Sequence, residues 1–178
     1  YNSNAGYLFA DCDIFNTALY VEPVGAVDKP EGVDVGYYVN MEELSKHLKI
    51  NPKNKKIALY FWGSWCKPCV DKLPQTLELY NFVKGKKNIE MFFCSFNNDN
   101  NDVIKSNLLL GGNIDENRRI NEFSRDVKML IHDDYTVQYS TLISTLKVGS
   151  YPTYVLVSED GKILYRDNTV SPHLYALI

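Results

Sequence analysis

The stretch of sequence that decides the fold runs from Ile57 to Cys69 and reads IALYFWGSWCKPC. Its first half, from Ile57 to Trp62, is continuously apolar, which is typical of a strand that is buried on both faces. Its end holds two cysteines, Cys66 and Cys69, that are separated by two residues. We therefore predict a buried strand that leads directly into a pair of reactive thiols.

A helix is expected to begin at this cysteine pair. Apolar residues recur at helical spacing after it, at Val70, Leu73, Leu77 and Tyr80. Cys66 would then lie, partly exposed, at the start of the helix, where backbone N–H groups and the positive end of the helix dipole stabilise a thiolate. Since Lys67 adds a nearby cation, we expect the pKa of Cys66 to fall to about 7 or below, from about 8.5 for a free thiol.

A C-x-x-C pair can also be half of a zinc site, which needs four ligands within reach. The other two cysteines, Cys12 and Cys94, stand alone and far apart in the sequence, and the three histidines show no paired ligand spacing (His47, His132 and His173). A zinc knuckle also has no need of a strand that leads directly into the pair. The pattern therefore favours redox chemistry and predicts no metal ligands.

The Trp65-Cys66-x-x-Cys69 motif after an apolar strand resembles the active site of the thioredoxin superfamily. A second landmark is Pro74, eight residues after Cys66, where the active-site helix of that family is kinked by a proline. Taken without the resemblance, Pro74 predicts only that the helix bends.

A third landmark is the segment from Val148 to Thr153, which resembles the loop whose cis proline faces the two cysteines in that family. An X-Pro bond is cis only about one time in twenty, so the cis Tyr151–Pro152 bond is implied by the resemblance and not by the spacing. Without it, Pro152 reads as the first residue of an edge strand.

Within the superfamily, the residue at position 60 separates this chain from many thioredoxins, which carry a buried aspartate six residues before the first cysteine. Tyr60 at that place, with a small residue and a serine before Trp65, resembles the tryparedoxin and nucleoredoxin-like branch, as does the apolar segment 88–96. The chain departs from their W-C-P-P-C motif at Lys67. A phenol with a pKa near 10 is a poor base at neutral pH, so Tyr60 would orient water or the leaving thiol, or simply pack in the strand.

The resemblance implies an α/β thioredoxin-like fold, with a central mixed β-sheet flanked by helices, and a thiol-disulfide oxidoreductase without a cofactor. Cys66 would attack a substrate disulfide and Cys69 would resolve the mixed disulfide. The residues expected to shape the site or dock the substrate are Trp65, Lys67, Pro68, Tyr151, Pro152 and Tyr60. Its partners would be protein disulfides and an upstream thiol reductant.

Length and composition fit one domain over residues 1–178, with 45% hydrophobic residues. Residues 1–35 read as an N-terminal extension, and residues from about 97 to 146 as a helical insertion between the active-site half and the proline half. A net charge of -3 argues against nucleic acid as a partner. No apolar stretch approaches the roughly 20 residues of a membrane span. The four cysteines do not look like a disulfide framework, but their use does not settle the compartment. A cytoplasmic location is favoured, and a secreted or organellar one stays open because the N-terminus could be processed.

Several further elements are predicted along the chain. They are a possible edge strand at 18–21, a helix through Met41, Leu44 and Leu48 capped by Asn40 with Glu43, a solvated loop at 97–101, a short helix through Val103, Ile104, Leu108 and Leu109, a longer helix through Ile120, Phe123, Val127 and Leu130, a brief helix through Leu142, Ile143 and Leu146, a hairpin of strands 153–158 and 163–166, and a final helix within 171–178. Cys94, in the middle of the strand at 89–96, is expected to be an inert, buried residue.

Two functions of other classes stay open at this point. The chain could be a thioredoxin-fold interaction module of a larger complex, with secondary redox activity. It could also be a membrane-side or secreted thiol oxidoreductase that matures a dedicated client, as cytochrome-maturation thioredoxins do.

Overall fold

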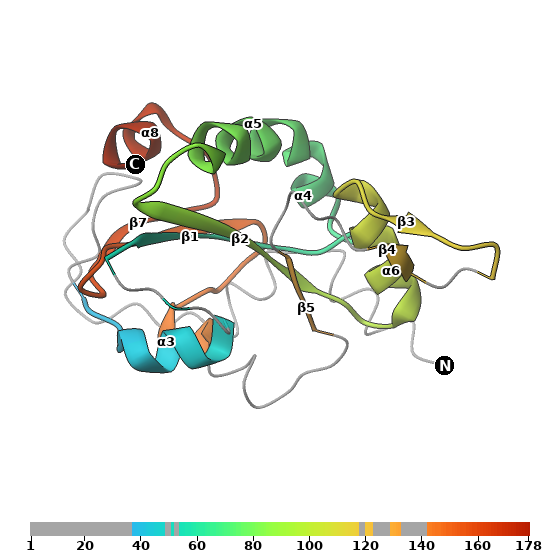
Figure 1. Ribbon diagram of the computed structural model, residues 1–178, viewed down its shortest axis with the longest axis horizontal. Helices are drawn as coiled ribbons and strands as arrows, with labels where there is room; N and C mark the ends of the chain where they lie inside the picture. Colours follow the sequence, from blue (N-terminus) through green and yellow to red (C-terminus); the bar gives the residue numbers. More distant parts are fainter. Residues whose placement is uncertain (1–36, 49–50, 52–53, 118–119, 123–128, 133–141) are drawn as a thin grey trace.

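The computed structural model describes residues 37–48, 51, 54–117, 120–122, 129–132 and 142–178 (Figure 1). The predicted N-terminal extension, its possible edge strand at 18–21 and Cys12 lie outside the described residues. The described helices are α3 (Met41–Leu48), α4 (Lys67–Asp71), α5 (Leu73–Lys84), α6 (Asn100–Leu109) and α8 (Pro172–Leu177), and the strands are β1 (Lys56–Trp62), β2 (Ile89–Phe96), β3 (Asn113–Ile114), β4 (Ile120–Glu122), β5 (Met129–His132), β6 (Thr153–Val157) and β7 (Ile163–Asp167).

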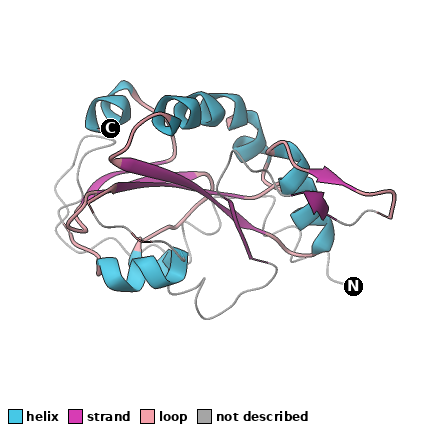
Figure 2. Cartoon of the chain, in the orientation of Figure 1, coloured by secondary structure: helices cyan, strands magenta, loops and turns pink. Residues whose placement is uncertain are grey.

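Five strands form a mixed sheet in the order β5-β2-β1-β6-β7. The strands, drawn in magenta, cross the middle of the molecule between helices (Figure 2). β2 pairs in parallel with β1 and with β5, whereas β6 runs antiparallel to β1 and to β7. Helices α5 and α8 cover one face and α3 the other (Figure 1). Because both faces are covered, every residue of β1 after Lys56 is buried, as its continuous apolar run predicts. The predicted mixed sheet flanked by helices is confirmed.

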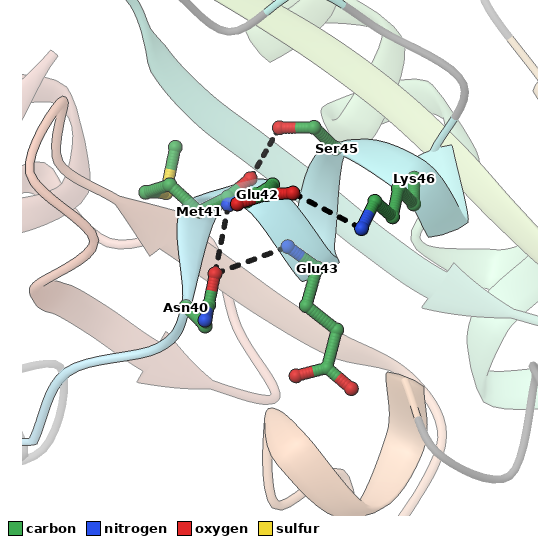
Figure 3. A network of polar contacts seen from close by, with 6 residues as sticks. All are labelled: Asn40, Met41, Glu42, Glu43, Ser45 and Lys46. Atoms are coloured by element: carbon green, nitrogen blue, oxygen red, sulfur yellow. Dashed lines mark hydrogen bonds and ion pairs between the residues drawn. The ribbon is translucent and has the colours of Figure 1, made fainter.

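Helix α3 begins where the sequence predicts a cap. The Asn40 side-chain oxygen accepts hydrogen bonds from the backbone N–H groups of Glu42 (2.9 Å) and Glu43 (3.1 Å), which satisfies two donors of the first turn (Figure 3). On the same helix, Lys46 and Glu42 form an exposed ion pair at 3.1 Å (Figure 3). The opposite side of α3 packs Leu44 and Leu48 into the core.

The helix after the cysteines is divided at Lys72, which ends α4 and begins α5. Pro74, in the first turn of α5, has no N–H to donate to the preceding turn, so the hydrogen-bond ladder is interrupted there. The bend that Pro74 predicts is confirmed.

The beginning of the insertion differs from the prediction. Residues 97–101 are a solvated loop only in part: residues 98–101 are exposed, but Asn97 is fully buried and Asn100 is the first residue of α6. The reason is capping, because the Asp99 side chain accepts a hydrogen bond from the Asp102 N–H at 3.0 Å and so starts a helix within the polar run. The predicted short helix through Val103 and Leu109 is confirmed as part of α6.

The longer helix predicted through Ile120 and Leu130 is wrong. Residues 120–122 form β4, which pairs with β3, and residues 129–132 form β5, which pairs in parallel with β2 and places Leu130 opposite Cys94. In a short apolar run, the spacing of the apolar residues does not distinguish a helix from a strand. Here pairing with the edge of β2 makes residues 129–132 a strand. Phe123 and Val127 lie outside the described residues.

The last part of the chain follows the prediction. A helical turn at 142–145 buries Leu142 and leads to the proline loop. β6 and β7 then form the predicted hairpin, in whose turn Gly161 has a φ of 93° and lies so close to the Val39 carbonyl that a side chain would collide with it. The final helix, α8, is capped by Ser171.

Candidate active site

The two cysteines of the motif lie at the carboxyl end of β1. Cys66 is the N-cap of α4, with its N–H donating to the Gly63 carbonyl (3.1 Å) and its carbonyl accepting from the N–H groups of Cys69 (3.0 Å) and Val70 (3.1 Å). This turn brings the two sulfur atoms within 2.6 Å of each other. The two sulfurs are therefore close enough to react with each other.

Both sulfurs are covered. Cys66 and Cys69 are each 0% exposed, so the prediction that Cys66 is partly exposed is wrong. The sequence could not show this, because the proline loop that lies against Cys66 is more than eighty residues away along the chain. The lowered pKa expected for Cys66 stays a prediction.

That loop approaches the cysteines as expected. The Tyr151–Pro152 peptide bond is cis, as the resemblance implies, and the Tyr151 carbonyl oxygen lies 3.7 Å from the Cys66 sulfur. Tyr151 and Pro152 are both buried, and β6 begins immediately afterwards at Thr153. The structure thus brings Cys66, Tyr151 and Pro152 together.

Three aromatic side chains form a cluster beside Cys66: Trp65, Phe96 and Tyr151. The Trp65 indole N–H donates to the Phe96 carbonyl at 2.9 Å, and its ring meets the Tyr151 ring edge to face, with centroids 5.8 Å apart. The Phe96 and Tyr151 rings stack with centroids 6.2 Å apart. Phe96 was not among the predicted site residues, and its position at the end of β2 is the signal that could have found it, because strands β1 and β2 are parallel and end at the same edge of the sheet.

Gly63 lies directly under this cluster. A Cβ atom at Gly63 would lie 2.5 Å from the Trp65 ring, closer than real Cβ contacts come. Glycine at this position therefore permits the indole to lie against the backbone of the active-site loop.

Lys67 and Pro68, between the cysteines, are exposed. The ammonium group of Lys67 forms an ion pair with Asp71 at 2.8 Å on the outer side of α4, and both side chains are more than half exposed. An exposed i,i+4 pair of this kind contributes little, and the Asp71 carboxylate offsets the charge of Lys67. The effect of Lys67 on Cys66 stays a prediction.

The cation that acts on the second cysteine is Lys72, which the sequence prediction missed. Burial raises the pKa of the Cys69 thiol to about 12, and a hydrogen bond from the Gly63 backbone and the charge of Lys72 partly oppose this rise. The Lys72 ammonium is held in place by a hydrogen bond to the Asn168 carbonyl at 2.7 Å. Cys69 is thus a neutral thiol that must lose a proton before it can react.

Tyr60 lies beneath Cys69 in the middle of the sheet. It is fully buried, and its hydroxyl donates to the Cys69 carbonyl at 3.0 Å. Burial raises the pKa of Tyr60 far above its usual value, followed by smaller contributions from Tyr154 and Cys69. Tyr60 is consequently a neutral donor that holds the backbone of α4, and it cannot act as a base.

Cys94 is buried in the middle of β2, as predicted, and burial raises its pKa. Among the residues that the structure describes, no three or more His, Cys, Asp or Glu side chains gather where a metal ion could bind. Within that same part of the chain, no helix has the length and apolar character needed to cross a membrane.

A C-x-x-C pair at the start of a helix, after a central strand and opposite a cis proline, defines the thioredoxin class of fold. The family model described as Thioredoxin-like matches residues 54–163, and the chain belongs to this family. The predicted membership of the thioredoxin superfamily is confirmed.

Among curated relatives, the thiol-disulfide oxidoreductase ResA of Bacillus cereus (strain ATCC 10987 / NRS 248) is 30% identical over 145 residues, which cover 79% of this chain and 73% of that protein. Probable nucleoredoxin 1 of Arabidopsis thaliana is 28% identical over 110 residues, which cover 62% of this chain and 16% of that protein. With other ResA proteins, such as that of Bacillus thuringiensis (strain Al Hakam), the chain spans about half of the relative's length (54%).

Among solved structures, tryparedoxin II from C. fasciculata superposes with a TM-score of 0.51 at 22% identity, and the match covers 77% of this chain and 88% of that one. At this identity the likeness shows the fold. Relatives of the tryparedoxin and nucleoredoxin kind, which Tyr60 and its neighbours predict, are thus among the matches.

Proposed function

We propose that the chain is a thiol-disulfide oxidoreductase in which Cys66 is the attacking thiol and Cys69 the resolving thiol. The observation that carries the proposal is the 2.6 Å separation of the two sulfurs beside the Tyr151 carbonyl. Membership of the thioredoxin-like family and the printed names of the ResA relatives support the reaction class.

The reaction has two steps. The Cys66 thiolate attacks one sulfur of a substrate disulfide, the substrate S–S bond breaks, and one substrate thiolate leaves while a mixed disulfide forms. Cys69 then loses its proton and attacks the Cys66 sulfur, which releases the second substrate thiolate and leaves a Cys66–Cys69 disulfide. The substrate gains two electrons and the dithiol loses two, so an upstream thiol reductant has to restore the pair.

Protein disulfides are the substrate class that the loop fits. The Tyr151 backbone beside Cys66 can pair with an extended substrate segment, as in strand addition, and Trp65 supplies the rim next to it. Since the Cys66 sulfur is covered, the substrate has to displace the atoms above it in order to reach it.

Reduction of insulin disulfides by dithiothreitol tests the proposal. The wild-type protein is expected to accelerate the precipitation of insulin chains, whereas Cys66→Ser abolishes the acceleration. Cys94→Ala serves as the matched control, because it also removes a buried cysteine but lies outside the site, and it should retain activity. A Cys66→Ser variant as active as the wild type contradicts the proposal.

The order of the two cysteines is tested by trapping. Cys69→Ser should accumulate mixed disulfides with protein substrates, because the attacking thiol remains while the resolving thiol is gone. Cys66→Ser should accumulate none. Equal trapping by both variants means that the roles are assigned incorrectly.

A further inference from the structure

We propose that Thr76 and Tyr154 are positioning residues for the resolving thiol of Cys69, and that they act through the junction between α4 and α5. The inference rests on the proposed function, because it assigns these residues to the second of its two steps.

The junction is a weak point of the helix that carries Cys69. Helix α4 has only five residues, and the ladder of backbone hydrogen bonds is interrupted at Pro74, which has no N–H to donate to the preceding turn. Two carbonyl groups at this break are bound by side-chain hydroxyls. The Cys69 carbonyl accepts from the Tyr60 hydroxyl at 3.0 Å. The Lys72 carbonyl accepts from the Thr76 hydroxyl at 2.8 Å in addition to the Thr76 N–H at 2.9 Å.

Thr76 is in turn bound by the sheet. Its hydroxyl lies 2.7 Å from the Tyr154 hydroxyl. A threonine hydroxyl has a single proton, so when Thr76 donates to the Lys72 carbonyl, Tyr154 is the donor to Thr76. A bond from Thr76 to the carbonyl four residues earlier is common in helices, but helix formation does not require the bond from Tyr154, which ties α5 to β6.

The three hydroxyls form one buried cluster under Cys69. Tyr60 and Thr76 are 0% exposed and Tyr154 is 2% exposed. Tyr60 lies opposite Tyr154 in the antiparallel pairing of β1 with β6, and the two rings stack with centroids 4.7 Å apart. Burial raises the pKa of Tyr154 to about 12, so the cluster is neutral and fixes the position of Cys69 without exchanging its proton.

Cys66 has a further support outside the two helices. Its N–H donates to the Gly63 carbonyl in the loop before α4. Loss of the hydroxyls at 76 and 154 should therefore leave the first step unchanged and slow the second step, in which the Cys69 sulfur has to reach the Cys66 sulfur in line.

The two steps are measured separately by stopped flow with 5,5′-dithiobis(2-nitrobenzoate). Attack by Cys66 releases one thionitrobenzoate, and resolution by Cys69 releases the second. All proteins carry Cys12→Ala and Cys94→Ala, so that only the motif cysteines react. The variants are Thr76→Val and Tyr154→Phe, with Thr76→Ser as the conservative variant that keeps the hydroxyl. Ser158→Ala is the control, because it removes a buried hydroxyl at the far end of β6.

We expect the second phase to slow about tenfold in Thr76→Val and in Tyr154→Phe, which corresponds to about 1.4 kcal/mol. The first phase should stay as in the parent protein, and Thr76→Ser and Ser158→Ala should match the parent in both phases. A second phase that is unchanged, or two phases slowed equally, overturns the inference; if Thr76→Val does not fold, Tyr154→Phe decides.

The failure of the proposed function gives a different result. A parent protein that releases one equivalent and never a second has no resolving thiol, which overturns the proposed function and the inference with it. If the parent protein releases two equivalents of thionitrobenzoate and the variants have the same rates as the parent, only the inference is overturned and the proposed function stands.

Discussion

Replacement of Gly63 by alanine should displace the Trp65 side chain from the active site. The new Cβ atom would lie 2.5 Å from Cε2 and Nε1 and 2.8 Å from Cζ2 of the indole, whereas ordinary contact begins at about 3.4 Å, so the ring has to move by about 1 Å. The left-handed backbone region plays no part, since only Gly111 and Gly161 among the described glycines have positive φ angles. The effect is therefore one of contact alone.

The cost of Gly63→Ala follows from what Trp65 would lose. A displaced indole gives up its hydrogen bond to the Phe96 carbonyl, which contributes about 1 kcal/mol, and loosens its ring contacts with Phe96 and Tyr151, each about 0.5–1.5 kcal/mol. We expect the free energy of unfolding to fall by about 2–3 kcal/mol. The KM for insulin should rise as well, because the rim beside Cys66 is disordered.

Urea unfolding followed by circular dichroism measures the first effect, and insulin reduction the second. Gly85→Ala is the matched control: Gly85 ends α5 with a φ of -86°, and its Cβ would meet no atom within 4 Å. That variant should be unchanged or slightly more stable. If Gly63→Ala and Gly85→Ala differ by less than about 0.5 kcal/mol in stability and share the same KM, the contact between Gly63 and Trp65 does not position the rim.

Three further results are expected. The rate of resolution by Cys69 should rise about tenfold per pH unit between pH 6 and 9, because a thiol with a pKa of about 12 is almost fully protonated there and each pH unit multiplies its thiolate fraction by ten. A rate of release of the second thionitrobenzoate that becomes constant below pH 9 contradicts this prediction. Lys72→Met should slow the release of the second thionitrobenzoate while Lys67→Glu leaves it unchanged, since Lys72 lowers the pKa of Cys69 and Lys67 is paired with Asp71 at the surface. A slower second release in Lys67→Glu than in Lys72→Met means that Lys72 is not the cation that acts on Cys69. Tyr60→Phe should lower the free energy of unfolding by about 1–2 kcal/mol, because the Cys69 carbonyl loses a buried donor; an unchanged urea midpoint shows that the bond is dispensable.

The sequence predicted those parts of the fold that local signals determine. The apolar run of β1, the kink at Pro74, the Asn40 cap and the hairpin around Gly161 each depend on residues a few positions apart. The prediction was wrong where a partner distant in sequence determines the secondary structure. Residues 129–132 form a strand because they pair with the edge of β2.

The site shows the same division. Cys66 and Cys69 were recognised from their spacing, and the cis bond before Pro152 from the resemblance. Phe96, Thr76 and Tyr154 were missed, because each looks like an ordinary core residue in its own segment and is linked to the surroundings of the cysteines only by a contact with a segment far along the chain.

Strand β6 links the surroundings of the two cysteines. Its register places Tyr154 opposite Tyr60, where the Tyr154 hydroxyl reaches Thr76 of α5. The residues just before Tyr154 place the Tyr151 carbonyl against Cys66. A shift of one residue would turn Tyr154 to the other face of the sheet and withdraw the proline loop at the same time. The antiparallel pairing of β1 with β6 therefore sets the surroundings of Cys66 and of Cys69 together, although the two sulfurs lie only 2.6 Å apart.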